Sequence, residues 1–207
     1  MPVDAVIFDI GNVLIEWQPE RFYDQAIGPQ RRKALFDALD LHQMNDRIDR
    51  GGHFRDTIYD FAQANPDWAD EIRMWHDNWI EMAAPAIPQS VRLLRALRAR
   101  SVPVLALSNF GIQNFDFAER EHYPFLGEFD QRFISGHMQM AKPDHDIYAA
   151  VEAQCGFAPE TLLFADDRAD NIATAQARGW QVHLFDGPQG WADRLVAEGL
   201  LTAEEAA

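Results

Sequence analysis

Several polar side chains that can do chemistry stand directly or shortly after short apolar runs. They are Asp9, Ser108, Asn109, Lys142, Asp166 and Asp167. Three carboxylates gathered at one place would repel one another unless a cation lay between them. Carboxylate oxygens suit Mg²⁺, which keeps waters and often shares a phosphate oxygen. The pattern therefore indicates a Mg²⁺ site beside a phosphate, with a carboxylate as the nucleophile on phosphorus.

The apolar runs that precede these residues are predicted to be parallel strands. Each is short and nearly all apolar, as in strands covered on both faces; they are Ala5–Phe8, 102–107, 132–135, 161–165 and 181–185. The segments between them, 89–100, 144–154 and 169–178, have helical character. This alternation predicts an α/β fold with a Rossmann-like, doubly wound parallel sheet. Ligands of such sheets bind at the carboxyl ends of the strands.

The stretch between residues 18 and 88 interrupts the alternation and contains no convincing strand. Four of its apolar residues step by four, three and four, which predicts the buried face of one helix: Trp68, Ile72, Trp75 and Trp79. An alternative is that a tryptophan of this stripe also lines a ligand pocket. We predict a core domain from 1–17 and 89–207, and a small helical cap domain from 18–88 that covers the site.

Composition limits the classes of partner. The chain has 207 residues, with 33 acidic and 18 basic side chains and a formal charge of -15. This acidity argues against nucleic acid and anionic membranes, which attract clustered Lys and Arg. The start of the sequence has no basic, then apolar, signal-like segment, so a cytoplasmic location is expected. A single cysteine, Cys155, excludes a disulfide framework. Oligomeric state stays open.

Taken in order, the polar segments resemble the four motifs of the haloacid dehalogenase superfamily. FDIGNVL from Phe8 resembles the first motif, and SN from Ser108 the second. KP from Lys142 resembles the third motif, and DDRADN from Asp166 the fourth. The inserted helices would then be the helical cap of the superfamily's first cap type (C1). Arg50 and Gly51, followed by a helix from about Phe54, resemble the cap loop that contacts substrate.

The resemblance implies a role for each matched residue, with Asp9 as the nucleophile. Catalysis is assigned to Asp9, Ser108 and Lys142; substrate binding to Ser108, Asn109, Lys142 and Arg50; Mg²⁺ binding to Asp9, the Gly11 carbonyl and Asp167, with Asp166 and Asn171 behind them.

Dehalogenases of the superfamily attack carbon, need no metal, and carry Ser-Ser-Asn-like residues at the position of Asp166 and Asp167. Two carboxylates there favour a Mg²⁺-dependent phosphatase that hydrolyses a small phosphate monoester through an aspartyl-phosphate on Asp9. A metal-independent 2-haloacid dehalogenase is the alternative from within the superfamily.

Gly11 is the departure from the phosphatase pattern. Phosphatases of the superfamily normally have an aspartate two residues after the nucleophile, and it serves as general acid and base. Such groups contribute about 10²–10⁴-fold to rate. The D-x-G-N-V motif resembles a branch that includes sugar-1-phosphate phosphatases, whose leaving group depends less on an acid. Alternatively a cap residue brings the proton, with His53 and Glu16 as guesses, or the protein binds a phosphorylated metabolite with little turnover.

Overall fold

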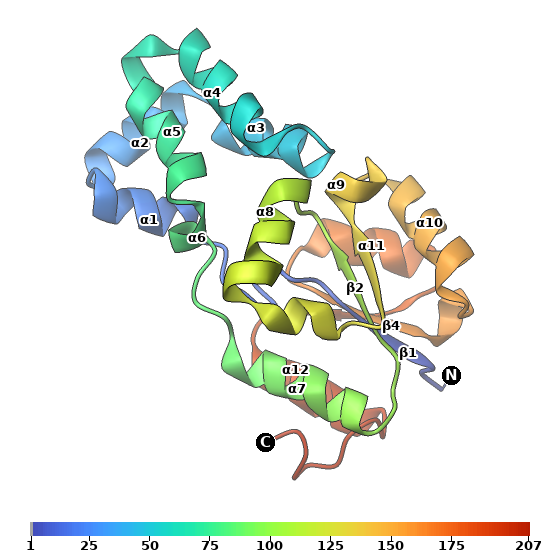
Figure 1. Cartoon of the computed structure of the whole chain (residues 1–207). Helices are drawn as coiled ribbons and strands as arrows, with labels where there is room; N and C mark the ends of the chain where they lie inside the picture. The colour runs from blue at the N-terminus through green and yellow to red at the C-terminus, as the bar shows by residue number, and fades with distance from the viewer. Residues whose placement is uncertain (1) are drawn as a thin grey trace.

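The five expected strands form one sheet in a computed structural model of the protein, which describes residues 2–207 (Figure 1). The strands are β1 (Ala5–Phe8), β2 (Val104–Ser108), β3 (Gln131–Ile134), β4 (Leu162–Asp166) and β5 (Gln181–Leu184). All neighbours are parallel, in the order β3-β2-β1-β4-β5. The observed bounds differ from the expected ones by up to two residues, so that Ser108 and Asp166 are the last residues of β2 and β4.

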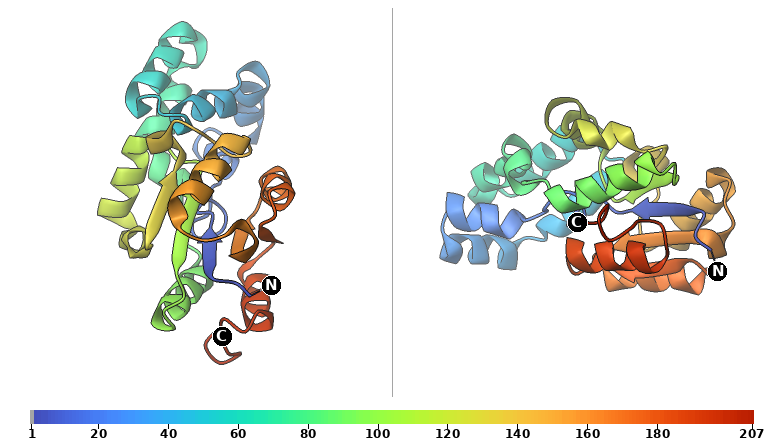
Figure 2. Two further views of the ribbon diagram at one scale, coloured as in Figure 1. Left: turned by 90° about the vertical axis from the view of Figure 1, so that its right-hand side faces the viewer. Right: turned by 90° about the horizontal axis from the view of Figure 1, so that it is seen from below.

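Helices cover both faces of the sheet, as the doubly wound prediction requires (Figure 2). The helices outside the inserted stretch are α7 (Pro88–Ala99), α8 (Ile112–Phe117), α9 (Ser135–Met138), α10 (His145–Cys155), α11 (Ala169–Ala177) and α12 (Pro188–Ala197). Phe8 and Ala106 share one buried cluster with residues of α7 and α12. Ile7 and Leu105, which alternate with them, pack in a second cluster with α10 and α11. Short helical turns complete this part at Ala118–His122, Pro124–Glu128 and Pro159–Thr161.

The inserted stretch is helical throughout its described elements, as expected. It contains α1 (Pro19–Ala26), α2 (Pro29–Ala38), α3 (Leu41–Asp49), α4 (Phe54–Ala64), α5 (Ala69–Asp77), α6 (Trp79–Met82) and a 3-10 turn at Pro66–Trp68. Figure 1 places these helices to one side of the sheet, with α3 next to α9. The domain boundaries at 17/18 and 88/89 stay a prediction.

The prediction that the tryptophan stripe lies on one helix is wrong. Trp68 ends the 3-10 turn, α5 stops at Asp77, and Asn78 leaves helical geometry with φ -117° and ψ 20° before Trp79 begins α6. An asparagine side chain competes for main-chain hydrogen bonds, which favours such a break. The buried role of the stripe is nevertheless confirmed for Ile72, Trp75 and Trp79, which are buried, while Trp68 is only partly buried.

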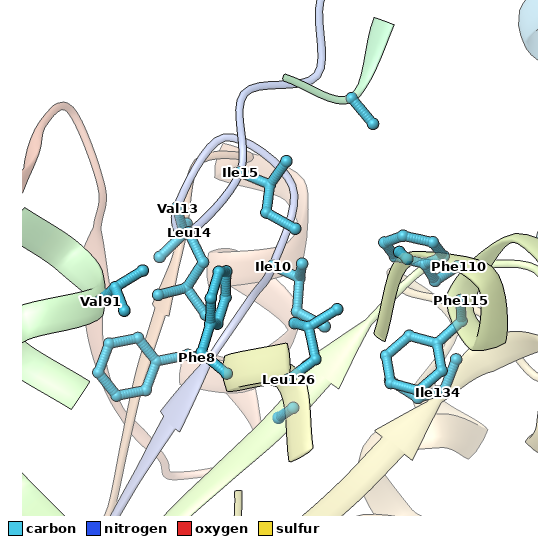
Figure 3. Packing of buried hydrophobic residues seen from close by; sticks show 14 of the residues in the cluster. Phe8, Ile10, Val13, Leu14, Ile15, Val91, Phe110, Phe115, Leu126 and Ile134 are labelled. Atoms are coloured by element: carbon cyan, nitrogen blue, oxygen red, sulfur yellow. The ribbon is translucent and has the colours of Figure 1, made fainter. Parts of the chain in front are cut away.

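The segment after β1 is anchored by its own apolar side chains. Ile10, Val13, Leu14 and Ile15 are buried, and Figure 3 shows them packed near Phe8. The main-chain oxygen of Ile10 accepts hydrogen bonds from the N–H groups of Val13, Leu14 and Ile15. This tight turn fixes the position of Asp9, the residue between Phe8 and Ile10.

Among the described residues, no helix is both long enough and apolar enough to cross a membrane.

Candidate active site

The expected site residues gather around a pocket of about 470 Å³, lined by the carboxyl ends of β1 and β2, the loop after β4, and cap helices. The predicted residues that line it are Asp9, Gly11, Arg50, Ser108, Asn109, Lys142, Asp167 and Asn171. Asp166 is fully buried behind them. The structure thus brings the predicted residues together around one pocket, and their individual roles stay predictions.

Lys142 lies between two buried carboxylates. Its Nζ atom is 3.0 Å from Asp9 Oδ1 and 2.6 Å from Asp166 Oδ2, and it donates to the Leu107 main-chain oxygen at 2.9 Å. The side chains of Lys142, Asp9 and Asp166 are 1%, 9% and 0% exposed. The ammonium group therefore uses all three of its hydrogen-bond donors, which is a condition for keeping such a charge buried.

One oxygen of Asp9 is held and the other is open. Oδ1 accepts hydrogen bonds of 2.7 Å from Ser108 Oγ and from the Ile10 N–H, in addition to its contact with Lys142. No hydrogen bond within the described chain reaches Oδ2. Asn109 acts indirectly: its Oδ1 accepts from Lys142 N at 2.8 Å, and its Nδ2 donates to Lys142 O at 2.9 Å. Asn109 therefore positions the lysine.

Asp167 is tied to the turn after β1 by Asn12. Asn12 Nδ2 donates to Asp167 Oδ2 at 2.9 Å, and Asn12 Oδ1 accepts from Trp17 N at 2.9 Å. Asn12 has φ 54°, in the left-handed region that asparagine tolerates better than most residues. Asn12 was assigned no role from the sequence, although it lies inside the first motif.

Asp166 has all of its acceptor positions directed at protein donors. Arg168 N donates to Oδ1 at 2.8 Å, and Asn171 Nδ2 lies 3.0 Å from both oxygens. Lys142 takes the remaining side of Oδ2. Asp166 therefore lies behind the pocket, while Asn171 lines the pocket and holds Asp166 in place.

Burial sets the electrostatics of the site. Loss of hydration raises the pKa of Asp9 to about 7; Lys142 opposes this shift, while Asp166 and Asp167 add to it. Burial also raises the pKa of Asp167. For Lys142, burial acts to lower the pKa, but the Asp166 and Asp9 carboxylates outweigh it and the pKa is raised. The site thus holds more negative charge than its lysine neutralises.

These residues fit Mg²⁺. Oxygen atoms of Asp9, Asp166 and Asp167 lie within 4.8 Å of one another, and these three carboxylates face the single positive charge of Lys142, so a bound cation would relieve their mutual repulsion. Because Asp166 is taken up by protein donors, Asp9 and Asp167 are the side chains that would hold the ion. Gly11, whose main-chain carbonyl is the third expected ligand, lines the same pocket.

The two residues considered as sources of a proton, His53 of the cap and Glu16 of the segment after β1, lie in different surroundings. His53 caps α4, with Nδ1 accepting from Asp56 N at 3.3 Å, so it has the role of a helix-start residue. Glu16 lines the pocket but pairs with Arg21 at 2.5 Å.

Arg50 lines the pocket and is held by two carboxylates. Its Nε lies 2.9 Å from Asp46 Oδ2, and its Nη1 lies 2.7 Å from Asp144 Oδ2. Asp46 belongs to α3 and Asp144 precedes α10, so the arginine links the inserted helices to the core. Its contact with substrate stays a prediction.

The pocket is also lined by residues that were not assigned to the site from sequence, among them Trp17, Asp49, Trp79 and Phe110. Trp79 bears out the alternative that a tryptophan of the stripe also faces a pocket. Asp49 carried no sequence signal, because its position depends on how α3 docks against the core.

Gly11 has room for a side chain. A Cβ atom built there would meet only Trp17 Cβ, at 4.0 Å, which is an ordinary van der Waals distance. Gly11 also lies outside the set of glycines with positive φ. Neither packing nor backbone conformation therefore requires glycine at this position.

Curated relatives share most of the length of the chain. It is 26% identical over 195 residues to the sesquiterpene phosphatase AstK of Aspergillus oryzae, with 88% of this chain and 90% of that protein covered.

Solved structures share the fold. A haloacid dehalogenase-family enzyme from Bacteroides thetaiotaomicron superposes with a TM-score of 0.73, at 21% identity over 94% of this chain and 99% of that one. A structure of that enzyme with magnesium and inorganic phosphate has a TM-score of 0.65, at 23% identity over 87% and 93%. An L-2-haloacid dehalogenase from Xanthobacter autotrophicus, with chloropropionic acid covalently bound, has a TM-score of 0.56 at 18% identity, over 99% and 86%.

The family model for haloacid dehalogenase-like hydrolases matches residues 3–179, which include every residue of the pocket described above. With the four motifs meeting at one edge of the parallel sheet, this match shows that the chain belongs to the haloacid dehalogenase-like hydrolases.

Proposed function

We propose that the protein is a Mg²⁺-dependent phosphatase that hydrolyses a small phosphate monoester through an aspartyl-phosphate on Asp9. The observation that carries the proposal is the set of three clustered carboxylates, Asp9, Asp166 and Asp167, with the buried Lys142 between two of them. A haloacid substrate would need no such excess of carboxylate. The phosphatase activity of the relative AstK supports the same assignment.

Each residue then has a defined task. An Asp9 oxygen forms a bond to phosphorus as the bond from phosphorus to the leaving oxygen breaks, and water later releases phosphate and regenerates the carboxylate. Ser108 and the Ile10 N–H hold the Asp9 carboxylate in one orientation. Lys142 supplies positive charge close to the reacting group. Mg²⁺, when bound, would offset the negative charge of the carboxylates and the phosphate.

The first experiment is hydrolysis of phosphate esters with and without Mg²⁺. We expect release of phosphate that stops in excess EDTA and returns with added Mg²⁺, and that falls at least about 10³-fold in Asp9→Asn. Unchanged hydrolysis by Asp9→Asn would contradict the proposal. Release of halide from 2-haloacids in EDTA would establish the dehalogenase alternative. Tight Mg²⁺-dependent binding of phosphate esters without product would establish a binding protein of low activity, which Gly11 makes the second candidate.

Two substrate classes deserve direct comparison. The D-x-G-N-V motif favours a sugar 1-phosphate. The pocket wall formed by Trp17, Trp79 and Phe110 favours an apolar organic group, as does the similarity to a sesquiterpene phosphatase. A panel of glucose 1-phosphate, glucose 6-phosphate and farnesyl monophosphate at saturating Mg²⁺ separates them. Preference for farnesyl monophosphate that is lost in Trp79→Ala would assign the apolar class.

A further inference from the structure

Helix α3 of the cap brings a carboxyl group to the pocket that Gly11 also lines. Asp49, the last residue of α3, lines the same pocket as Asp9 and is partly buried. Asn45 Nδ2 donates to Asp49 Oδ2 at 2.8 Å. No hydrogen bond within the described chain uses Oδ1, so this oxygen is available to a bound molecule.

Asp49 is held in place by the core. Its main-chain oxygen accepts a hydrogen bond of 2.5 Å from Ser135 Oγ, and the same hydroxyl accepts from the Phe110 N–H at 2.9 Å. Ser135 is fully buried at the start of α9, next to α3 in Figure 1. The end of α3 is therefore fixed to the loop that follows Ser108, and this contact holds Asp49 at the site.

Burial, together with neighbouring carboxylates, favours a neutral Asp49 carboxyl group that keeps its proton near neutral pH. Burial raises the pKa of Asp49 to about 7, and Asp46 on the same helix and Asp9 on β1 add to this shift; Asn45 and Arg50 oppose it. A group with a pKa close to the working pH exchanges protons most effectively in catalysis. Asp9 is close enough for its charge to raise the pKa of Asp49, although the two side chains come from different parts of the fold.

We propose that Asp49 is the general acid and base of this enzyme, in place of the aspartate that Gly11 lacks. The proposal rests on the proposed phosphatase function. When an Asp9 oxygen bonds to phosphorus, the bond to the leaving oxygen breaks and that oxygen takes the proton of the Asp49 carboxyl group. The Asp49 carboxylate then accepts a proton from water as the water oxygen bonds to phosphorus, which breaks the bond to Asp9 and releases phosphate.

The test compares two leaving groups in Asp49→Asn, a variant that keeps the size and the hydrogen bonds of the side chain. With an alkyl phosphate such as glucose 6-phosphate, we expect kcat to fall about 10²–10⁴-fold. p-Nitrophenol leaves without a proton, so p-nitrophenyl phosphate should show a burst of about one equivalent of p-nitrophenol per enzyme. The following turnover should be slow, because no base activates water against the aspartyl-phosphate.

Two further variants make the test specific. Gly11→Asp in the Asp49→Asn background should restore at least about tenfold of the lost rate and abolish the burst, since position 11 has room for the side chain. Asp60 is an exposed carboxylate of α4, so Asp60→Asn makes the same change of charge elsewhere in the cap. This variant should hydrolyse both substrates at the wild-type rate.

The outcomes separate this proposal from the proposed function. Suppose that the wild type hydrolyses esters through Asp9 but that Asp49→Asn shows no burst. If its activity toward the two substrates is then reduced equally, or is unchanged for both, Asp49 is not the acid and base. If wild type hydrolyses no phosphate ester, or Asp9→Asn is as active as wild type, the phosphatase assignment itself fails. Folding of each variant is verified by its thermal transition.

Discussion

The buried Lys142 lies between Asp9 and Asp166, and little solvent reaches these charges because their side chains are 1%, 9% and 0% exposed. Removing the ammonium group leaves two buried carboxylates without their cation. We expect Lys142→Met to lower the free energy of unfolding by about 3–5 kcal/mol at pH 8 and to abolish phosphatase activity. Urea denaturation with parallel rate assays measures both quantities.

The chain offers a matched control for this change. Lys33, its only other lysine, is exposed and pairs with Asp37 one turn along α2. Lys33→Met should change stability by less than about 1 kcal/mol and leave activity intact. Equal effects of the two substitutions would contradict the role given to Lys142.

The raised pKa of Asp49 leads to a second prediction, on how the free energy of unfolding changes with pH. Its pKa is raised from 3.8 to about 7, so the folded protein favours the neutral carboxyl group. The stability that this preference contributes is full below pH 3.8 and is lost as pH rises through about 7. Asn cannot ionise, so Asp49→Asn should be more stable than wild type by about 1–2 kcal/mol at pH 8.

At pH 5 this gain should be clearly smaller, because much of the loss in wild type has not yet occurred. Urea denaturation in EDTA at the two pH values measures the difference. A gain of the same size at both, or a loss of stability at pH 8, would show that ionisation of Asp49 does not strain the fold.

At the scale of elements, α9 packs against the loop after β2 with no spare room. A Cβ atom on Gly136 would lie 2.8 Å from the Phe110 oxygen and 2.9 Å from the Ile112 nitrogen, so main chain would have to move. We expect Gly136→Ala to cost about 1–3 kcal/mol and to lower kcat, because this loop also positions α3. Thermal unfolding and rate assays test it.

Gly127→Ala is the control for that substitution. Its Cβ atom would meet only the end of the Glu119 side chain, at 3.0 Å, which can turn away. Its effect should stay within about 1 kcal/mol. If the two variants behave alike, the tight packing of Gly136 does not position the site.

The sequence predicted those parts of the site that depend on strand order alone. Asp9, Ser108 and Asp166 follow apolar runs, and a parallel sheet brings such positions to one edge whatever the helices do. Asp49 and Trp17 could not be predicted in the same way. They reach the pocket only because of tertiary contacts, such as the Ser135 hydrogen bond to the end of α3.

Element boundaries were likewise predicted well in the core and less well in the cap. The strands and the three expected core helices, α7, α10 and α11, were predicted to within about two residues because burial leaves a clear apolar pattern, whereas α8, α9 and α12 were not predicted. In the cap, periodicity over Trp68 to Trp79 concealed the break at Asn78. Residues on either side of a break can still face one core, so spacing alone does not reveal where a helix stops.

At the scale of the whole molecule, charge opposes an anionic substrate. The formal charge is -15, and the carboxylates that line the pocket outnumber the cations Arg50, Lys142 and Arg168. Each of these cations is already paired with a carboxylate. A phosphate dianion therefore approaches a repulsive surface, and bound Mg²⁺ offsets only the part of the field nearest the site.

Salt should consequently favour the reaction. Raising NaCl from 10 to 200 mM shortens the screening length from about 30 Å to below about 10 Å and weakens repulsion by distant carboxylates. At saturating Mg²⁺, we expect kcat/KM for a phosphate monoester to rise about twofold to fivefold, with kcat nearly constant. A fall in kcat/KM would mean that attraction by Mg²⁺ and Lys142 outweighs the net charge. The acidity would then matter for solubility and leave substrate capture to the local field.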